Sequence, residues 1–125
     1  MKNFKQKLQN SNTNIGTFIS LASPMVSEII AQVGFDFVIV DLEHGIGNEK
    51  DTLAQLQAME SSPTASIVRV ESHERLRVNR ILDIGAEGIM FPRLKTAVEA
   101  AEAISAMYYP PIGTRGVAKM VPIGG

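Results

Sequence analysis

The chain has 125 residues, 45% of them hydrophobic, and a formal net charge of -1 at pH 7, which suits one modest core and argues against nucleic acid as a partner. It contains no cysteine, so disulfides, thiolate metal sites and a cysteine nucleophile are excluded. No apolar run approaches the ~20 residues of a membrane helix or follows a signal-peptide pattern, so we expect a cytoplasmic protein without a membrane partner.

The first helical signal lies at the N-terminus, where Met1, Phe4 and Leu8 recur at helical spacing and predict a short helix that could cover the bottom of a barrel. Four apolar segments rich in β-branched and aromatic residues follow, at 15–22, 35–42, 65–70 and 88–94. Their apolar character is nearly continuous, not alternating, which is typical of parallel strands covered on both faces. We therefore predict four strands after one short helix.

The segments that separate and follow these strands have helical character. Ser23 and Pro24 predict a cap and a helix start, and Thr96 with Glu99 forms a capping-box pattern at the start of a helix over 96–107. In the other helices, apolar residues recur on one face. They are Val26, Ile29, Ile30 and Val33 in the helix that starts at Pro24, Leu53, Leu56 and Met59 in helix 49–61, and Leu76, Ile81 and Ile84 in helix 73–84.

A small repeat supports this order, because Gly34-Phe35-Asp36 and Gly85-Ala86-Glu87 each stop a helix with glycine and add an acid before a strand. Alternating strands and helices predict a parallel sheet with right-handed crossovers. A doubly wound sheet would carry a glycine-rich fingerprint after its first strand, and residues 21–24 hold none. A closed β/α barrel takes eight strands and roughly 250 residues. The predicted fold is therefore α/β, the N-terminal half of a TIM (β/α)8 barrel, with residues 1–125 as one incomplete domain.

Polar residues gather where the predicted strands end. The second strand leads into Asp41-Leu42-Glu43-His44-Gly45, the third ends at Arg69, and the fourth ends at Phe91-Pro92-Arg93. In β/α barrels the C-terminal strand ends form the mouth of the active site. A carboxylate buried at the end of an apolar strand needs a partner or a role, so this group is the candidate site.

Each of these residues also has a structural interpretation. His44 stands beside a glycine and is of a kind often found as an ordinary loop residue, although the aspartate three residues earlier could orient its imidazole and raise its basicity. Arg69 could pair with Glu71 or Glu74, but its place inside an apolar run favours the barrel mouth. His73 lies in a charged stretch, and we interpret it as an exposed helix-start residue without a function.

Taken together, these motifs resemble the HpcH/HpaI aldolase family, the class II pyruvate aldolases related to citrate lyase β-subunits. The matching pieces, in chain order, are Asn3-Phe4-Lys5, Gly34-Phe35-Asp36-Phe37, Asp41-Leu42-Glu43-His44-Gly45, Val68-Arg69-Val70, Leu82-Asp83-Ile84-Gly85-Ala86 and Tyr109-Pro110-Pro111 with Gly113, Arg115 and Gly116. They cover nearly the whole chain, and the glutamate-histidine-glycine block followed by the proline-rich run is the specific part of the signature.

The resemblance implies a reversible aldol cleavage of a 4-hydroxy-2-oxo acid to pyruvate, or a related 2-oxo acid, and an aldehyde. It implies a divalent metal, Mg, Mn or Co, that stabilises the enolate as a Lewis acid. His44 would match the family's catalytic base, with Asp41 orienting it, and Arg69 would match the arginine that stabilises the enolate charge. Glu43 would hold a metal-bound water as a neighbour of the site. The resemblance carries no role onto Arg115.

The family's metal ligands are a glutamate at the end of the fifth strand and an aspartate after the sixth. This sequence ends at Gly125, so we expect no metal ligand in this chain and place the ligands beyond it. The simplest expectation is a truncated reading frame or a fragment whose missing part is C-terminal. None of Asp41, Glu43 and Glu87 is expected to substitute for a ligand.

Two functions therefore stand beside each other. The first is a carbon–carbon lyase seen incompletely, and the second is a catalytically incomplete half-barrel that binds a partner or survives as a remnant. An open sheet leaves two edges with unpaired backbone groups and one face without its facing half, so we expect a homo-oligomer or, failing that, a loosely packed chain. The sequence does not identify the aldehyde.

Overall fold

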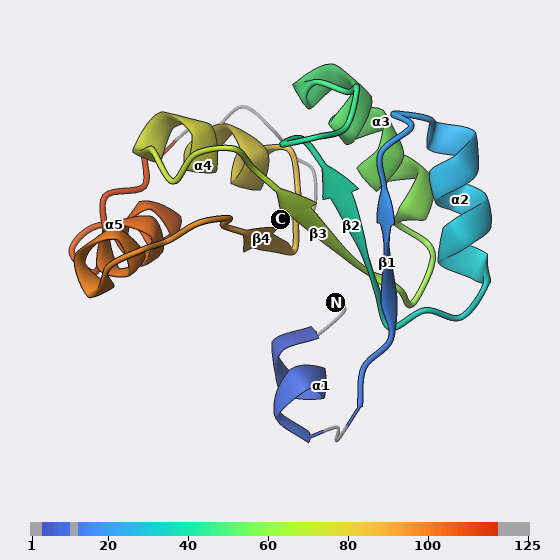
Figure 1. The fold of residues 1–125 in the computed structure, drawn as a ribbon, viewed down its shortest axis with the longest axis horizontal. Coiled ribbons are helices and arrows are strands. Elements are labelled where there is room, and N and C mark those ends of the chain that lie inside the picture. Colours follow the sequence, from blue (N-terminus) through green and yellow to red (C-terminus); the bar gives the residue numbers. More distant parts are fainter. Residues whose placement is uncertain (1–3, 11–12, 118–125) are drawn as a thin grey trace.

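The computed structural model describes residues 4–10 and 13–117, which form one four-stranded parallel sheet and five helices (Figure 1). The elements in chain order are α1 (Phe4–Asn10), β1 (Gly16–Ile19), α2 (Pro24–Gln32), β2 (Phe37–Asp41), α3 (Glu49–Met59), β3 (Ala65–Arg69), α4 (Arg75–Asp83), β4 (Gly88–Met90) and α5 (Ala97–Met107). The predicted α/β order of one short helix and four β–α units is confirmed. Met1, Asn3 and the end of the chain from 118 onward lie outside the described residues.

The sheet runs β1-β2-β3-β4, and each strand is parallel to the next. The two outer strands are shorter than predicted, because the loops that follow them turn at residues with left-handed backbone, Ala22 with φ of 52° and Arg93 with φ of 57°. A residue in that region cannot continue an extended strand. The strand ends are therefore set by the loops at the C-terminal side of the sheet.

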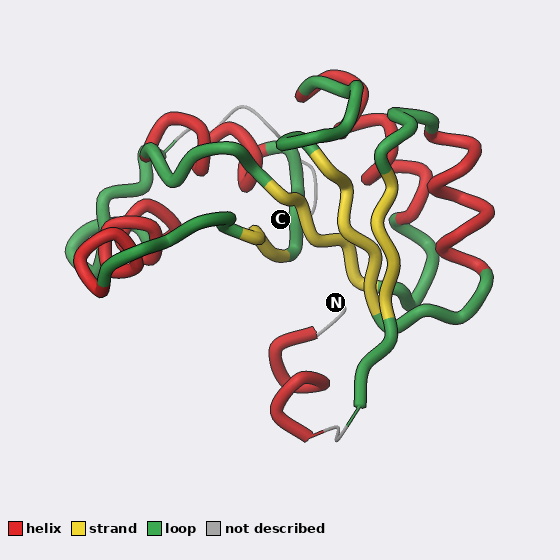
Figure 2. Tube along the Cα trace, viewed as in Figure 1, coloured by secondary structure: helices red, strands yellow, loops and turns green. Residues whose placement is uncertain are grey.

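One face of the sheet carries the core. Val38, Val40 and Val68 are buried there with Met59 and Ile81 from the helices. Figures 1 and 2 show α2 and α3 packed side by side over β1 and β2, with α4 and α5 on the β4 side of the sheet. In the described residues, no helix is long and apolar enough to span a membrane.

Buried hydroxyl groups tie α2 to the segment that follows α3. Ser62 Oγ and Thr64 Oγ1 both donate to the carbonyl oxygen of Ala31, at 3.0 and 2.9 Å. Gln55 Nε2 donates to Ser27 Oγ at 2.9 Å. These bonds satisfy polar groups that would otherwise be buried unpaired, including a carbonyl in the last turn of α2. The hydrophobic pattern did not predict this interface, because its members are polar and small.

The glycine-acid repeat has the predicted structural role. Gly34 and Gly85 have φ of 106° and 101°, in the left-handed region that ends a helix. Asp36 then accepts a hydrogen bond from the backbone N–H of Ile15 at 2.7 Å, and Glu87 accepts one from the backbone N–H of Ser66 at 3.1 Å. In both places the backbone N–H of the acid donates back to the carbonyl of the same residue. Each acid therefore links the start of its own strand to the strand before it in the chain. Asp36 links β2 to β1, and Glu87 links β4 to β3.

Two expectations about apolar faces are wrong. Leu76 is 64% exposed, and the core-facing side of α4 is formed by Val78, Asn79 and Ile81. In α2 the buried positions are Ser27 and Ala31, while Ile29 and Val33 lie in solvent. The small residues let α3 approach α2 closely, and this contact determines which side of α2 faces inward.

The N-terminal helix contacts the sheet at the end where the strands begin (Figure 1). The Phe4 ring lies 5.3 Å from the Phe37 ring, and Lys7 forms an ion pair with Asp36. Leu8 is 52% exposed, so the helix covers the sheet through Phe4 and not through Leu8.

Candidate active site

Asp41 and Arg69 are opposite each other at the C-terminal ends of β2 and β3. Arg69 Nε donates to Asp41 Oδ1 at 2.9 Å, and Nη2 donates to Oδ2 at 2.6 Å. This two-point geometry is the strong form of an arginine–carboxylate pair. Asp41 is only 4% exposed, so the pair forms a nearly buried floor at this end of the sheet.

The charges of this pair stabilise each other. The Arg69 guanidinium, together with backbone N–H groups, lowers the pKa of Asp41 from 3.8 to about 2 against the opposing effect of burial. The hydrogen bond from Arg69 to Asp41 raises the pKa of the guanidinium in turn. Both groups are therefore ionised at neutral pH.

The loop after β2 is folded around the Asp41 carboxylate. Its Oδ1 accepts hydrogen bonds from the backbone N–H groups of Glu43 at 3.0 Å and His44 at 3.2 Å. The backbone N–H of Ile46 then donates to the carbonyl oxygen of Ser20 at 3.2 Å, which ties the loop to the end of β1. Aspartate side chains commonly hold the following turn in this way.

Gly45 is required in this loop by close backbone contact. A Cβ atom there would lie 2.1 Å from the carbonyl oxygen of Asp41 and 3.3 Å from that of Ser20. No side chain fits in that space. The glycine that follows His44 in the motif therefore keeps the loop close to the strand ends.

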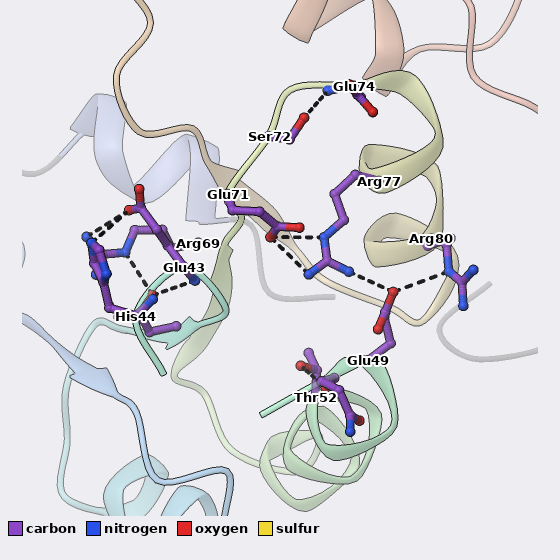
Figure 3. A network of polar contacts seen from close by, with 12 residues as sticks. Glu43, His44, Glu49, Thr52, Arg69, Glu71, Ser72, Glu74, Arg77 and Arg80 are labelled. Atoms are coloured by element: carbon purple, nitrogen blue, oxygen red, sulfur yellow. Dashed lines mark hydrogen bonds and ion pairs between the residues drawn. The ribbon is translucent and has the colours of Figure 1, made fainter. Parts of the chain in front are cut away.

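Glu43 lies among three basic side chains, of which Figure 3 labels His44 and Arg69. Its Oε2 is 3.6 Å from Arg69 Nη1 and 3.6 Å from His44 Nε2, and its Oε1 is 3.2 Å from Arg93 Nη2. The Glu43 side chain is 8% exposed, whereas that of His44 is 71% exposed. The result is a buried acid with an accessible imidazole and an accessible guanidinium beside it.

The four residues expected at the site are brought together, but one contact differs from the expectation. The Asp41 carboxylate binds the backbone N–H of His44, while the His44 ring lies by Glu43. Aspartate thus orients the loop that carries the imidazole and does not itself hydrogen-bond the ring. Arg69 pairs with Asp41 and Glu43 and not with Glu71 or Glu74, and Glu71 binds Arg77 instead.

Two neighbours of the site were not assigned a role from the sequence. Arg93 ends the predicted fourth strand, and in the structure it has a left-handed backbone and its Nη2 lies 3.2 Å from Glu43 Oε1. Phe18 of β1 lies under Arg69, with the guanidinium carbon 4.8 Å from the ring centroid. The register of β1 against β2, which pairs Phe18 with Ile39, places this ring beside the site, and the sequence pattern does not predict that register.

A second ion-pair group lies near the site and joins three elements (Figure 3). Arg77 of α4 donates to Glu49 of α3 at 2.7 Å and to Glu71 after β3 at 3.0 Å, and Arg80 is 3.3 Å from Glu49. These pairs connect neighbouring β–α units. His73 is partly buried, not exposed as expected, and its Nε2 lies 3.5 Å from Glu102.

The proline-rich run after α5 packs on α4. Arg115 Nη2 donates to Asp83 Oδ1 at 3.0 Å, and its guanidinium carbon lies 4.7 Å from the Tyr109 ring centroid. A Cβ atom on Gly113 would lie 2.2 Å from the carbonyl oxygen of Ser105. The glycine and the arginine of this motif therefore fold the loop onto the helices.

The acidic and histidine side chains of the site do not converge as metal ligands do. Within residues 4–10 and 13–117, no three His, Cys, Asp or Glu side chains converge to hold an ion. The oxygens of Asp41 and Glu43 are engaged by guanidinium groups. These residues do not form a metal cage by themselves.

Comparison with known proteins gives the family. A family model described as HpcH/HpaI aldolase/citrate lyase matches residues 14–123. The chain is 38% identical over 117 residues to a hydroxypyruvate/pyruvate aldolase of Paraburkholderia phytofirmans, a match that covers 94% of this chain and 44% of that protein. It is 38% identical over 118 residues to a 4-hydroxy-2-oxo-heptane-1,7-dioate aldolase of Salmonella dublin, covering 94% and 45%.

A solved structure agrees with this assignment. An HpcH/HpaI aldolase/citrate lyase family protein from Burkholderia cenocepacia superposes with a TM-score of 0.90 at 34% identity, over 97% of this chain and 50% of that one. The chain thus spans about half the length of the curated relatives it matches. It belongs to the HpcH/HpaI aldolase/citrate lyase family, and the half-barrel fold expected from the sequence is confirmed.

Proposed function

We propose that this member of the family supplies the base and the enolate-stabilising arginine for reversible cleavage of a 4-hydroxy-2-oxo acid to pyruvate, or a related 2-oxo acid, and an aldehyde. The observation that carries the proposal is the two-point Asp41–Arg69 pair with the accessible His44 imidazole on the loop that Asp41 holds. Family membership supports the same reaction class.

In the cleavage direction, His44 accepts the proton of the substrate's 4-hydroxyl group. The bond between C3 and C4 breaks, C4 becomes the aldehyde carbon, and the electron pair forms the enolate of the 2-oxo acid. A proton returned to C3 completes the products. General base catalysis of this kind typically contributes ~10²–10⁴-fold.

Arg69 is proposed to stabilise the enolate oxygen. Nε and Nη2 are fixed on Asp41, so the guanidinium is held rigidly, while Nη1 lies 3.6 Å from Glu43. The Phe18 ring covers the guanidinium on one side. A charge fixed before the reaction begins stabilises developing negative charge without reorganisation.

The family resemblance implies a divalent metal, Mg, Mn or Co, that would act as a Lewis acid on the 2-oxo acid. The described residues do not form its ligand set, so its ligands are proposed to come from outside them. Glu43 forms ion pairs with Arg69 and Arg93. We propose that it would also hold a metal-bound water, as the resemblance implies.

The substrates are proposed to be small 2-oxo acids and an aldehyde. The names of the two relatives point to different tails, because a heptane-1,7-dioate carries two carboxylates whereas hydroxypyruvate and pyruvate carry one. The protein is also proposed to be cytoplasmic and to assemble as a homo-oligomer.

The test is an aldolase assay on the chain joined to the part of the Paraburkholderia aldolase that it does not cover. Pyruvate release is followed with a coupled dehydrogenase, with added Mn²⁺ or Mg²⁺ and then with a chelator. We expect metal-dependent cleavage that His44→Ala lowers by ~10²–10⁴-fold. Arg69→Ala is expected to be severely impaired as well.

His73→Ala is the matched control and is expected to be nearly silent, since His73 pairs with Glu102 away from the site. The 125-residue chain alone is expected to show no metal-dependent turnover. A joined protein that folds but cleaves no 4-hydroxy-2-oxo acid would contradict the proposal.

The second candidate is a half-barrel that binds a partner without catalysis. The observation that favours it is the ligand set, because the described residues offer a base and an arginine but no group of three metal-ligating side chains. Failure of the joined protein, together with a partner that remains bound to His44→Ala, would support this function instead.

A further inference from the structure

Arg93 lies after β4, at the same end of the sheet as Asp41 and Arg69. Its φ of 57° is in the left-handed region, which is uncommon for residues other than glycine. Such a conformation persists where the surroundings hold it, and it is concentrated at functional sites. The Arg93 side chain reaches Glu43 from this position.

Glu43 brings the two guanidinium groups to one place. Its Oε1 lies 3.2 Å from Arg93 Nη2, and its Oε2 lies 3.6 Å from Arg69 Nη1. The two arginines are therefore separated by no more than the width of one carboxylate and its contacts. Since Glu43 is 8% exposed, it is a nearly buried anchor that fixes the near end of the Arg93 guanidinium.

The rest of the Arg93 guanidinium is accessible. Its side chain is 70% exposed, and among the described residues the pair with Glu43 uses only Nη2. Arg69, by contrast, is 21% exposed and is committed to Asp41 through Nε and Nη2. An arginine with open N–H groups on a planar fork binds a carboxylate at two points.

We infer that Arg93 binds a second carboxylate, so that this protein takes hydroxy-oxo acids, or acidic aldehydes, with a carboxylate at the end remote from the reacting carbons. The inference rests on the proposed function, which puts the 2-oxo acid end of the substrate at Arg69. A substrate held there reaches Arg93 with a carboxylate a few bonds further along its chain. Arg93 is therefore a specificity residue, and Glu43 positions it.

The test uses two probes with the same six-carbon chain, 2-oxoadipate and 2-oxohexanoate, which differ in the distal carboxylate. Binding to the joined protein of the aldolase assay, with added Mg²⁺, is measured by titration of backbone amide NMR signals at constant ionic strength. Arg93→Gln removes the charge with little loss of length. Arg80→Gln is the matched control, because Arg80 is 62% exposed and pairs with Glu49 in the other ion-pair group.

We expect the unmodified joined protein to bind 2-oxoadipate about fivefold more tightly, the scale of one exposed but well-oriented ion pair. Arg93→Gln should lose this preference and keep its affinity for 2-oxohexanoate, and Arg80→Gln should keep both. A preference that persists in Arg93→Gln would overturn the inference. An equal loss of affinity for both probes would also overturn it, because Arg93 would then act only by neutralising the charge of Glu43.

The same titration distinguishes a failure of the proposed function from a failure of the inference about Arg93. If neither probe shifts the amide signals of Asp41, His44 or Arg69, these residues do not face a 2-oxo acid, and the proposed function and the inference are both overturned. If both probes bind there without a preference, only the inference is overturned.

Discussion

The ionisation of Asp41 couples folding to pH at the scale of a single residue. Its pKa is about 2 in the folded chain against an ordinary value of 3.8. A lowered carboxyl pKa stabilises the folded state above the ordinary value, and that stabilisation is lost as the pH falls through the folded pKa. We expect a loss of about 2 kcal/mol between pH 5 and pH 2, from the 1.36 kcal/mol that each pKa unit represents.

The measurement is urea unfolding at a series of pH values for the unmodified chain and Asp41→Asn. The variant is less stable at pH 6, because the Arg69 charge loses its partner. The gap between the two proteins should narrow as the pH falls to 2. A gap that stays constant over this range would show that the carboxylate contributes nothing through its charge.

A second prediction at this scale compares two glycines, because Gly45 is required by a close contact and Gly34 by its backbone angle. Gly45→Ala places a methyl group against the carbonyl oxygen of Asp41 and should cost about 3 kcal/mol. Gly34→Ala meets no atom within 4 Å and pays only for its φ of 106°, about 1 kcal/mol. Thermal or urea unfolding of both variants provides the comparison, and equal losses would contradict it.

The sequence predicted that the candidate residues lie together better than it predicted their contacts. Asp41 and Arg69 end neighbouring parallel strands, so the topology alone brings them together. The pairing of the His44 ring with Glu43 depends on how the loop closes around Asp41. The approach of Arg93 depends on one left-handed residue. Neither follows from hydrophobic pattern or spacing, because both are set by local backbone angles.

At the scale of elements, the helix starts show why caps can be predicted. Thr96 Oγ1 accepts from the backbone N–H of Glu99 at 3.1 Å, and Glu99 accepts from that of Thr96, as the capping box predicts. This interaction is local in sequence and needs no tertiary partner. The burial of Leu76 and Val33 was predicted wrongly, because it depends on which neighbouring helix approaches.

Among the helices whose N-cap residue the structure describes, α4 lacks such a cap. Its N-cap residue is Glu74, which makes no side-chain cap hydrogen bond. Glu74→Asp keeps the charge at the helix start and shortens the side chain to the length that reaches the first-turn N–H groups. We expect a gain of about 0.5–1 kcal/mol in the free energy of unfolding.

The comparison for this prediction is the opposite change at an existing cap. Thr96→Ala should destabilise the chain by about 1 kcal/mol. Both variants are measured by urea unfolding. A Glu74→Asp chain no more stable than the unmodified one would show that the start of α4 is held by other contacts, such as Ser72 with the backbone N–H of Glu74.

At the scale of the whole molecule, helices cover one face of the described sheet, whereas the other face is covered only in part, with Phe37 packed against Phe4 and Ile39 only 3% exposed. Core residues such as Val38, Val40 and Val68 point to the helices, and the residues that alternate with them point to the other face. Phe18 on that second face is 47% exposed. Strands β1 and β4 also each have one neighbour in the described sheet, so both edges present unpaired backbone groups.

These two features predict self-association of the 125-residue chain, since apolar surface and open edges are both stabilised by contact with another chain. We expect a dimer by light scattering, or a monomer that binds a hydrophobic dye. Phe18→Lys should weaken both signals, because it puts a charge on the exposed part of this second face. Met25→Lys is the matched control, since Met25 is 71% exposed on α2 and should change neither. A monomer that unfolds cooperatively and binds no dye would show that the sheet is stable with part of one face and two edges in solvent, and assembly would then have no role in completing this fold.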